Sequence, residues 1–225
     1  MGTTQSIKTG REIEGLRQTV LRMGGLCEAI LAKSLRAAWA RDERLSEEVA
    51  RDDLEIDRLD VEVDAAVLRV LALRAPVAAD LRQVLAIKNL ATDLERVGDL
   101  ARNIASSAHR LSHRDPVTPP PRLRSLAEDA QRSLARAMQS FADLDARQAR
   151  AVIAEDEDID ALEGTVIREA IARIREEPSL SEQEIDLIFI AKSLERIADH
   201  ATNIAEEVVL AAEALNLKHA EKLSR

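Results

Sequence analysis

Aromatic residues are almost absent from this 225-residue chain, which has one Trp, two Phe and no Tyr. Glycine and proline are also scarce, at seven and six residues. Sandwiches and barrels are built from β-branched and aromatic strands joined by many turn residues, so this composition disfavours an all-β fold. The chain also lacks the aromatic side chains on which proteins stack single-stranded nucleic acids. We expect its few large aromatics, Trp39 and Phe189, to lie in the core.

Several further absences concern the cellular compartment. The single cysteine, Cys27, cannot form an internal disulfide, which favours a reducing cytoplasm. The first eleven residues contain no apolar stretch of the kind found in signal peptides. No run approaches the roughly 18 uncharged apolar residues of a membrane-spanning helix. We therefore expect a cytoplasmic protein with no transmembrane segment.

A positive charge excess is missing as well. The chain has 32 Lys and Arg against 41 Asp and Glu, which gives a formal net charge of -9. Nucleic-acid-binding proteins carry a basic footprint, so we expect no nucleic-acid partner. Charged residues make up 32% and apolar residues 46%, as in globular proteins. The abundance of Ala, Leu, Arg and Glu favours long helices.

The few prolines divide the chain. The segment 112–122, SHRDPVTPPPR, contains three consecutive prolines and is interpreted as a linker. Pro76 and Pro178 each mark a turn between two long helices. Ser181 and Glu184 predict a capping box at the start of the last helix. The sequence thus predicts an all-α protein of two tandem three-helix bundles, residues 1–115 and 116–225, with helices near 9–43, 46–74, 78–110, 121–144, 146–176 and 181–217.

The two halves are an internal duplication. Residues 91–105 (ATDLERVGDLARNIA) and 191–205 (AKSLERIADHATNIA) are identical at nine of 15 positions. Residues 52–60 (DDLEIDRLD) and 155–163 (EDEDIDALE) match in acidic and aliphatic character at seven of nine positions. Similarity at a fixed shift indicates that each half repeats the same arrangement of helices.

Each half contains two copies of the pattern acid-x-x-x-acid. The spacing places both carboxylates of a copy on one helix face, one turn apart. Short turns make neighbouring helices antiparallel, so each hairpin would gather four carboxylates at one level. On the third helix, Glu95 and Asp99 lie opposite the apolar Leu90, Leu94 and Ile104, which predicts a site outside the core. The four copies are Asp53/Asp57, Glu95/Asp99, Asp156/Asp160 and Glu195/Asp199.

Gathered carboxylates repel one another, and a bound cation would offset the repulsion. Two of them about 6 Å apart repel by roughly 1–3 kcal/mol in a partly aqueous setting. Arg102 and Lys192 could each offset one charge, and His200 alone could add a nitrogen ligand. Oxygen donors suit Mg²⁺, Mn²⁺, Ca²⁺ or iron. The simpler interpretation of any one pair is a solvated helix face.

Catalytic signatures are not found. The chain has no Gly-rich phosphate loop, no nucleophile elbow and no HExxH motif, so we expect no enzyme. A metal-dependent, carboxylate-bridged enzyme and a helical scaffold without metal are kept as alternatives. The remaining histidines, His109, His113 and His219, are given no role at this point.

Two segments resemble the PhoU family of phosphate-uptake regulators. They are residues 73–105 (LRAPVAADLRQVLAIKNLATDLERVGDLARNIA) and 190–208 (IAKSLERIADHATNIAEEV). The shared form LER-[VI]-x-D-x-A-x-N-I-A is specific, whereas acid-x-x-x-acid alone is common. The resemblance extends over nearly the whole chain.

The resemblance implies a cytoplasmic, homodimeric regulator that is not an enzyme and restrains phosphate uptake and phosphate-starvation signalling. The implied partners are the ATPase subunit of the phosphate ABC importer and a membrane sensor histidine kinase. It also implies metal ions at the acidic motifs, with Fe, Mn, Mg, Zn and Ca as candidates. Gly98 stands where the second half has Ala198, so the first site is expected to be looser. The implied ligands are Glu95, Asp99, Glu195, Asp199, Asp53, Asp57, Asp156, Asp160, Asn103 and Asn203.

Overall fold

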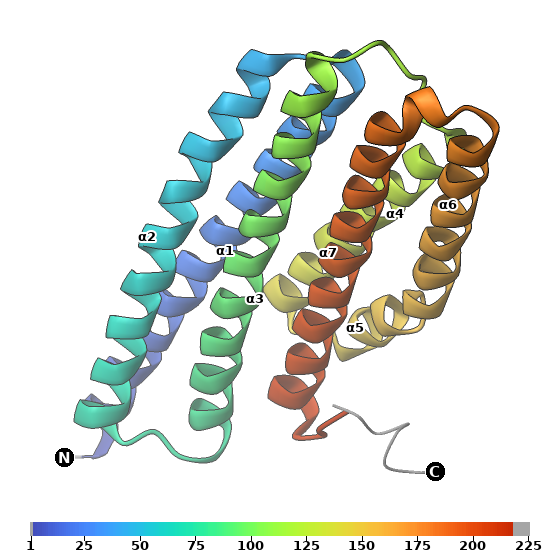
Figure 1. The fold of residues 1–225 in the computed structure, drawn as a ribbon. Helices are drawn as coiled ribbons and strands as arrows, with labels where there is room; N and C mark the ends of the chain where they lie inside the picture. The colour runs from blue at the N-terminus through green and yellow to red at the C-terminus, as the bar shows by residue number, and fades with distance from the viewer. Residues whose placement is uncertain (1, 218–225) are drawn as a thin grey trace.

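The computed structural model describes residues 2–217, which form two helical bundles with no strand among them. This confirms the all-α class and the two three-helix bundles. In Figure 1 the first bundle stands on the left and the second on the right. The elements are α1 (Gly2–Ala40), α2 (Glu43–Arg74), α3 (Ala78–Ser112), α4 (Pro121–Asp143), α5 (Ala146–Ile153), α6 (Asp156–Glu176), the short 3-10 turn η1 (Pro178–Leu180) and α7 (Ser181–Glu213).

Helices α3 and α7 lie side by side at the centre of the molecule, and the two bundles meet chiefly along them (Figure 1). Each also packs on the other helices of its own bundle. Their apolar side chains are buried at the positions expected from the spacing, and the second half repeats them. These residues are Leu90, Leu94, Val97, Ile104, Leu194, Ile197 and Ile204. No helix within residues 2–217 combines the length and apolarity needed to cross a bilayer.

Local sequence signals explain most helix ends. Asp42 caps α2 by accepting a hydrogen bond of 3.2 Å from the Leu45 backbone N–H. Pro121 opens α4 at its first position, where the missing N–H costs nothing. The turns at Pro76 and Pro178 fall where they were predicted. The linker is tied to the first bundle, because the Arg41 guanidinium donates to the backbone carbonyls of Ser112, Arg114 and Asp115.

The prediction of one continuous helix over 146–176 is wrong. The chain forms α5 and then α6, which run in different directions in Figure 1. Ala154 and Glu155 keep right-handed backbone angles at the junction, so neither proline nor glycine marks the break. Three acidic residues, Asp156 to Asp158, follow at once and favour a new helix N-terminus through the helix dipole.

The predicted capping box at Ser181 is also wrong. The residue at the cap position is Leu180, because the 3-10 turn runs directly into α7. The Ser181 hydroxyl donates to the Pro178 carbonyl instead. Glu184, whose side chain is buried, accepts a hydrogen bond of 2.7 Å from Arg173 of α6. The acidic residue therefore links two helices rather than capping one.

Gly98 allows α2 to approach α3 closely. A Cβ atom at this position would lie 2.6 Å from Asp53 Oδ1 and 3.3 Å from Ile56 Cδ1. The Asp53 side chain is only 1% exposed and is held by Arg102, whose Nη1 donates to Asp53 Oδ2 over 2.7 Å. Glycine here thus makes room for a buried carboxylate, and the space beside it is filled.

We expect Gly98→Ala to destabilise the protein by about 1–3 kcal/mol. Alanine would gain about 1 kcal/mol in helix propensity, but its methyl group would displace Asp53 from its ion pair in a well-packed contact. Urea unfolding followed by circular dichroism measures the difference.

Gly25→Ala is the matched control within α1, since a Cβ there has no neighbour within 4 Å. We expect it to raise the free energy of unfolding by about 0.5–1 kcal/mol. If both substitutions stabilise the protein alike, the close approach at Gly98 does not matter.

Candidate metal sites in the two acidic groups

The second half brings its predicted carboxylates together between α6 and α7. We call Asp156, Asp160, Glu195 and Asp199 the second-half acidic group. One oxygen from each of Asp160, Glu195 and Asp199 lies within 4.8 Å of the others. Asp156, at the start of α6, accepts a hydrogen bond of 2.9 Å from Thr202 Oγ1. Within residues 2–217, Asp160, Glu195 and Asp199 form no ion pair, and Lys192 pairs with Glu163 at 3.2 Å.

Burial and crowding raise the pKa values of this group. Burial, together with the charges of Asp199, Asp160 and Glu163, raises the pKa of Glu195 from 4.5 to about 7. Burial also raises the pKa of Asp199 and of Asp160, with neighbouring acids adding to both effects. Unpaired carboxylates that share one space are the arrangement that a cation stabilises, because the cation offsets the repulsion between their charges.

The first half holds its carboxylates differently. We call Asp53, Asp57, Glu95 and Asp99 the first-half acidic group. Arg102 lies between α2 and α3 and donates to Asp53 over 2.7 Å and to Asp99 over 2.5 Å. Arg96 adds ion pairs of 3.3 Å to Glu95 and 3.2 Å to Asp99. Burial raises the pKa of Asp53, and the Arg102 charge opposes that rise.

A single difference between the halves accounts for much of this contrast. Position 102 is arginine, whereas the duplicated position 202 is threonine. The Arg102 guanidinium thus supplies positive charge where the first-half group would hold a cation, while Thr202 offers only a hydroxyl. The second-half acidic group is therefore the better candidate for metal, with an all-oxygen donor set that suits hard cations.

The two asparagines of the motif lie toward the contact between the bundles. Asn203 donates to Asp93 Oδ1 of α3 over 3.3 Å, and His200 Nδ1 lies 2.8 Å from the same oxygen. Asn103 lines a cavity of about 360 Å³ between α3 and α7, beside Phe189. Phe189 is 52% exposed, so its prediction as a core residue is wrong. Trp39 is partly buried and packs against the core rather than within it.

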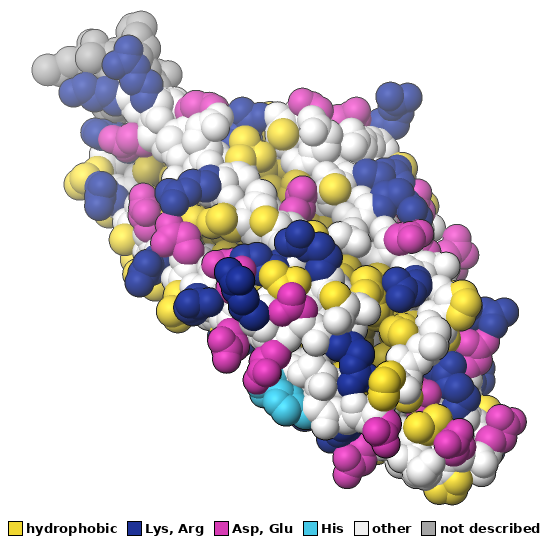
Figure 2. All heavy atoms as spheres, turned by 90° about the horizontal axis from the view of Figure 1, so that it is seen from above, with side chains coloured by type: hydrophobic (Ala, Val, Ile, Leu, Met, Phe, Trp, Pro, Cys, Tyr) yellow, Lys and Arg dark blue, Asp and Glu magenta, His cyan; other side chains and the backbone are white. Residues whose placement is uncertain are grey.

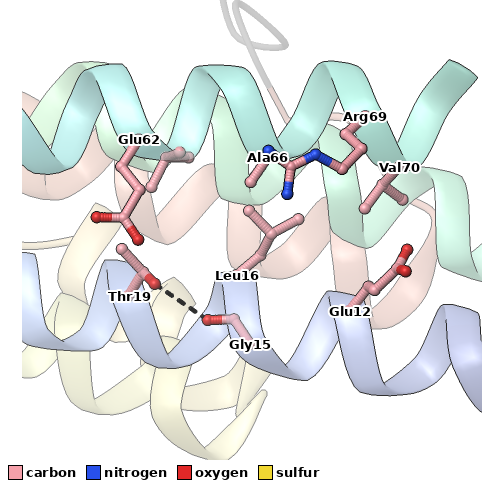
Figure 3. A pocket seen from close by; sticks show the side chains of 9 residues that line it. Glu12, Gly15, Leu16, Thr19, Glu62, Ala66, Arg69 and Val70 are labelled. Carbon is pink, nitrogen blue, oxygen red and sulfur yellow. Dashed lines mark hydrogen bonds between the residues drawn. The ribbon is translucent and has the colours of Figure 1, made fainter.

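A separate hollow lies on the other side of α2. It has a volume of about 300 Å³ and lies between α1 and α2, whereas the first-half acidic group lies between α2 and α3 (Figure 3). The short Gly15 and Ala66 leave space there, and Thr19 donates to the Gly15 carbonyl over 3.1 Å. Glu12, Glu62 and Arg69 also line it, so its charges are mixed, unlike those of the second-half acidic group.

The outer surface mixes both signs of charge. On the face seen in Figure 2, basic and acidic side chains alternate over short distances, with apolar patches between them. Many of these charges belong to local ion pairs, such as Arg150 with Glu213 at 2.5 Å. The second-half acidic group differs from this surface because Asp160, Glu195 and Asp199 lie together without an ion pair among the described residues.

The raised pKa of Glu195 predicts how stability changes with pH in metal-free protein. The folded state binds this proton more tightly than the unfolded chain does, so the stability it contributes is present below about pH 4.5 and is lost as the pH rises toward 7. We expect a loss on the order of 1 kcal/mol, because solvent screens this partly exposed group. Urea unfolding at several pH values, in the presence of chelator, measures it.

Glu195→Gln should flatten this pH dependence, whereas Glu47→Gln on the exposed face of α2 should leave it unchanged. A wild-type stability that rises between pH 5 and 7.5, or an unaltered profile in Glu195→Gln, would contradict the assigned origin of the effect.

Comparison with known proteins places the whole chain in one family. The family model described as "PhoU domain" matches residues 20–108 and 123–208, one match in each bundle. The PhoU homolog of Zymomonas mobilis, a phosphate-specific transport system accessory protein, is 36% identical over 201 residues, which cover 89% of this chain and 85% of that protein. The homolog of Caulobacter vibrioides is 34% identical over 206 residues, covering 91% and 90%.

Solved structures agree with the sequence comparison. The crystal structure of PhoU from Pseudomonas aeruginosa superposes with a TM-score of 0.89 at 32% identity, covering 92% of this chain and 99% of that one. The phosphate transport system regulatory protein PhoU from Streptococcus pneumoniae gives a TM-score of 0.86 at 26% identity, covering 93% and 99%. Two matched domains, identities above 30% over most of the chain and this shared fold lead to one conclusion: the chain belongs to the PhoU family.

Proposed function

We propose that this protein is a negative regulator of phosphate uptake and of phosphate-starvation signalling. It works in the cytoplasm, as a homodimer, by contact with the ATPase subunit of the phosphate ABC importer and with the membrane sensor histidine kinase. The observation that carries the coarser statement, a role in regulating phosphate transport, is membership of a family whose relatives are named accessory proteins of the phosphate-specific transport system. The named partners are the finer part of the proposal.

The chemistry of the acidic groups supports a regulator rather than an enzyme. General acid–base or nucleophilic catalysis needs an activated nucleophile beside a base, or a metal with an open position next to bound substrate. His200 is engaged with Asp93, and Lys192 is engaged with Glu163. The second-half acidic group therefore offers charge and oxygen ligands, and we propose that it has a binding role.

We propose that metal binds first at the second-half acidic group, with Asp160, Glu195 and Asp199 as its ligands and Asp156 beside them. Fe, Mn, Mg, Zn and Ca ions all accept such carboxylate donors. An ion at this position would join α6 to α7 and would fix the surface that the second bundle presents to a partner. Asp53, Asp57, Glu95 and Asp99 form the second proposed position, at which an ion competes with Arg102.

We expect added divalent metal to raise the melting temperature of the wild-type protein and to leave Glu195→Gln/Asp199→Asn unaffected. An ion that binds only the folded state stabilises it by about 2.7 kcal/mol at 100 times its dissociation constant. The substitutions also remove like-charge repulsion, so the metal-free variant should melt at or above the metal-free wild type. Differential scanning calorimetry with and without metal measures both effects.

Glu157→Gln/Asp158→Asn is the matched control. It also removes two carboxylates, but these are exposed and lie in the first turn of α6. It should keep the full response to metal. A metal response that survives in Glu195→Gln/Asp199→Asn would place the binding elsewhere in the chain.

We expect the ATPase subunit of the importer to be retained by the immobilised wild-type protein, and less of it to be retained after chelation. The physical reason is that metal orders the surface formed by α6 and α7. The measurement is a quantitative pulldown with purified components, in which Glu195→Gln/Asp199→Asn should behave as the chelated wild type.

If chelation leaves the retention of the ATPase subunit unchanged, the partner stays in the proposed mechanism and the metal does not. No retention under any condition would remove this partner from the proposal. The two results bear on separate parts of the proposed function.

A further inference from the structure

Three side chains with metal-ligating atoms meet at the end of the first bundle where α3 ends and α2 begins. Glu43 is the first residue of α2, His109 lies in the last turn of α3, and His113 follows its last residue. Figure 2, which views the molecule from this end, shows histidine at the surface beside acidic side chains. None of the three residues belongs to either acidic group.

The distances suit a single small cation. His109 Nδ1 and His113 Nε2 each lie 3.6 Å from Glu43 Oε1, and one ligand atom from each of the three residues lies within 4.8 Å of the others. Tetrahedral zinc, with bonds of about 2.0–2.1 Å to nitrogen and oxygen, holds its ligands about 3.3 Å apart. Movements of a few tenths of an ångström at the two 3.6 Å contacts, and a further rotation of these partly exposed side chains, would complete three corners of a tetrahedron.

The local helix geometry brings the two rings together. Histidines four residues apart lie on one face of a helix, and these ring centroids are 4.8 Å apart. His113 follows the end of α3 with a backbone still close to helical. Two imidazoles at this spacing are the arrangement by which a single helix supplies two zinc ligands.

A second contact orients the His113 ring. Its Nδ1 lies 3.0 Å from the His109 backbone carbonyl and 3.1 Å from Ser112 Oγ. Since a carbonyl only accepts, Nδ1 carries the hydrogen and donates it. Nε2 is then left with its lone pair on the side where Glu43 lies. Histidines that bind metal are commonly held by such a bond from the other ring nitrogen.

The donor set selects the class of metal. Two imidazole nitrogens and one carboxylate oxygen suit Zn²⁺ and neighbouring transition metals, whereas Mg²⁺ and Ca²⁺ prefer oxygen alone. All three side chains are about half exposed, at 50% for Glu43, 45% for His109 and 57% for His113, so an ion can enter directly from solvent. We propose that Glu43, His109 and His113 form a zinc-type site with three protein ligands and a fourth position open to water.

The position of this site gives it a structural consequence. Arg41, two residues before Glu43, already holds the linker through carbonyls of Ser112, Arg114 and Asp115. An ion on Glu43, His109 and His113 would join the start of α2 to the end of α3 at the point where the linker leaves. It would thus fasten the first bundle at its connection to the second, on elements that the second-half acidic group does not touch.

The test uses tag-free, full-length protein carrying Glu95→Gln/Asp99→Asn and Glu195→Gln/Asp199→Asn, so that neither acidic group competes for metal. Zn²⁺ is titrated by calorimetry, and Cu²⁺ is added as a spectroscopic probe for electron paramagnetic resonance. We expect one zinc site in this background and nitrogen coupling in the copper spectrum. His109→Gln/His113→Gln should weaken zinc binding at least tenfold and remove the nitrogen coupling, and Glu43→Gln should weaken binding without removing that coupling.

His219→Gln is the control for a histidine that is not one of the three proposed ligands, and it should change neither readout. Circular dichroism should show full helicity in every variant, because the substituted side chains of the site are exposed. Zinc affinity that persists in His109→Gln/His113→Gln, or a copper spectrum without nitrogen coupling in the parent, would overturn the proposal. Neither result bears on the acidic groups or on the partners in phosphate transport.

Discussion

Burial of the apolar stripes of α3 and α7 determines where the charged groups of this protein lie. Leu94 and Ile104 of α3, with Leu194 and Ile204 of α7, are completely removed from solvent. Once these faces point inward, the carboxylates on the opposite side of each helix are turned toward α2 or α6. The same two helices also form the main contact between the bundles. Core packing, the contact between the bundles and the candidate metal sites therefore all depend on α3 and α7. A shift of either helix would affect all three.

Much of this arrangement could be predicted because the spacing of apolar and acidic residues is regular along whole helices. The spacing of Leu90, Leu94 and Val97 predicts a buried face, and the four-residue spacing of Glu95 and Asp99 predicts a shared face outside it. Prolines at 76 and 178 predict the turns that bring the helices back. The duplication then extends each inference from one half to the other. These signals depend only on residue type and on a regular helix, so they are visible before any contact is known.

The remaining features depend on contacts between helices, which spacing does not encode. The pairing of Arg102 with both Asp53 and Asp99, and the bond between Asp93 and His200, each require knowledge of how neighbouring helices are placed. The end of the last helix was missed for another reason. Ala214 adopts a left-handed cap conformation that glycine usually marks, so the sequence carries no stop signal after Glu213. The site at Glu43 combines both difficulties, although the spacing of His109 and His113 is itself a visible signal.

On the proposed metal binding, the arginine at position 102, matched by threonine at position 202, would make the two copies of the duplicated unit unequal in their affinity for metal. An ion entering the first-half acidic group must displace a guanidinium, whereas one entering the second-half group meets no such competitor among residues 2–217. On the proposed metal binding, occupancy would be sequential as the metal concentration rises, with two thresholds instead of one. Such a chain could hold no ion, an ion in the second-half acidic group alone, or ions in both groups. A partner that contacts both bundles would then respond in two steps as the metal concentration rises.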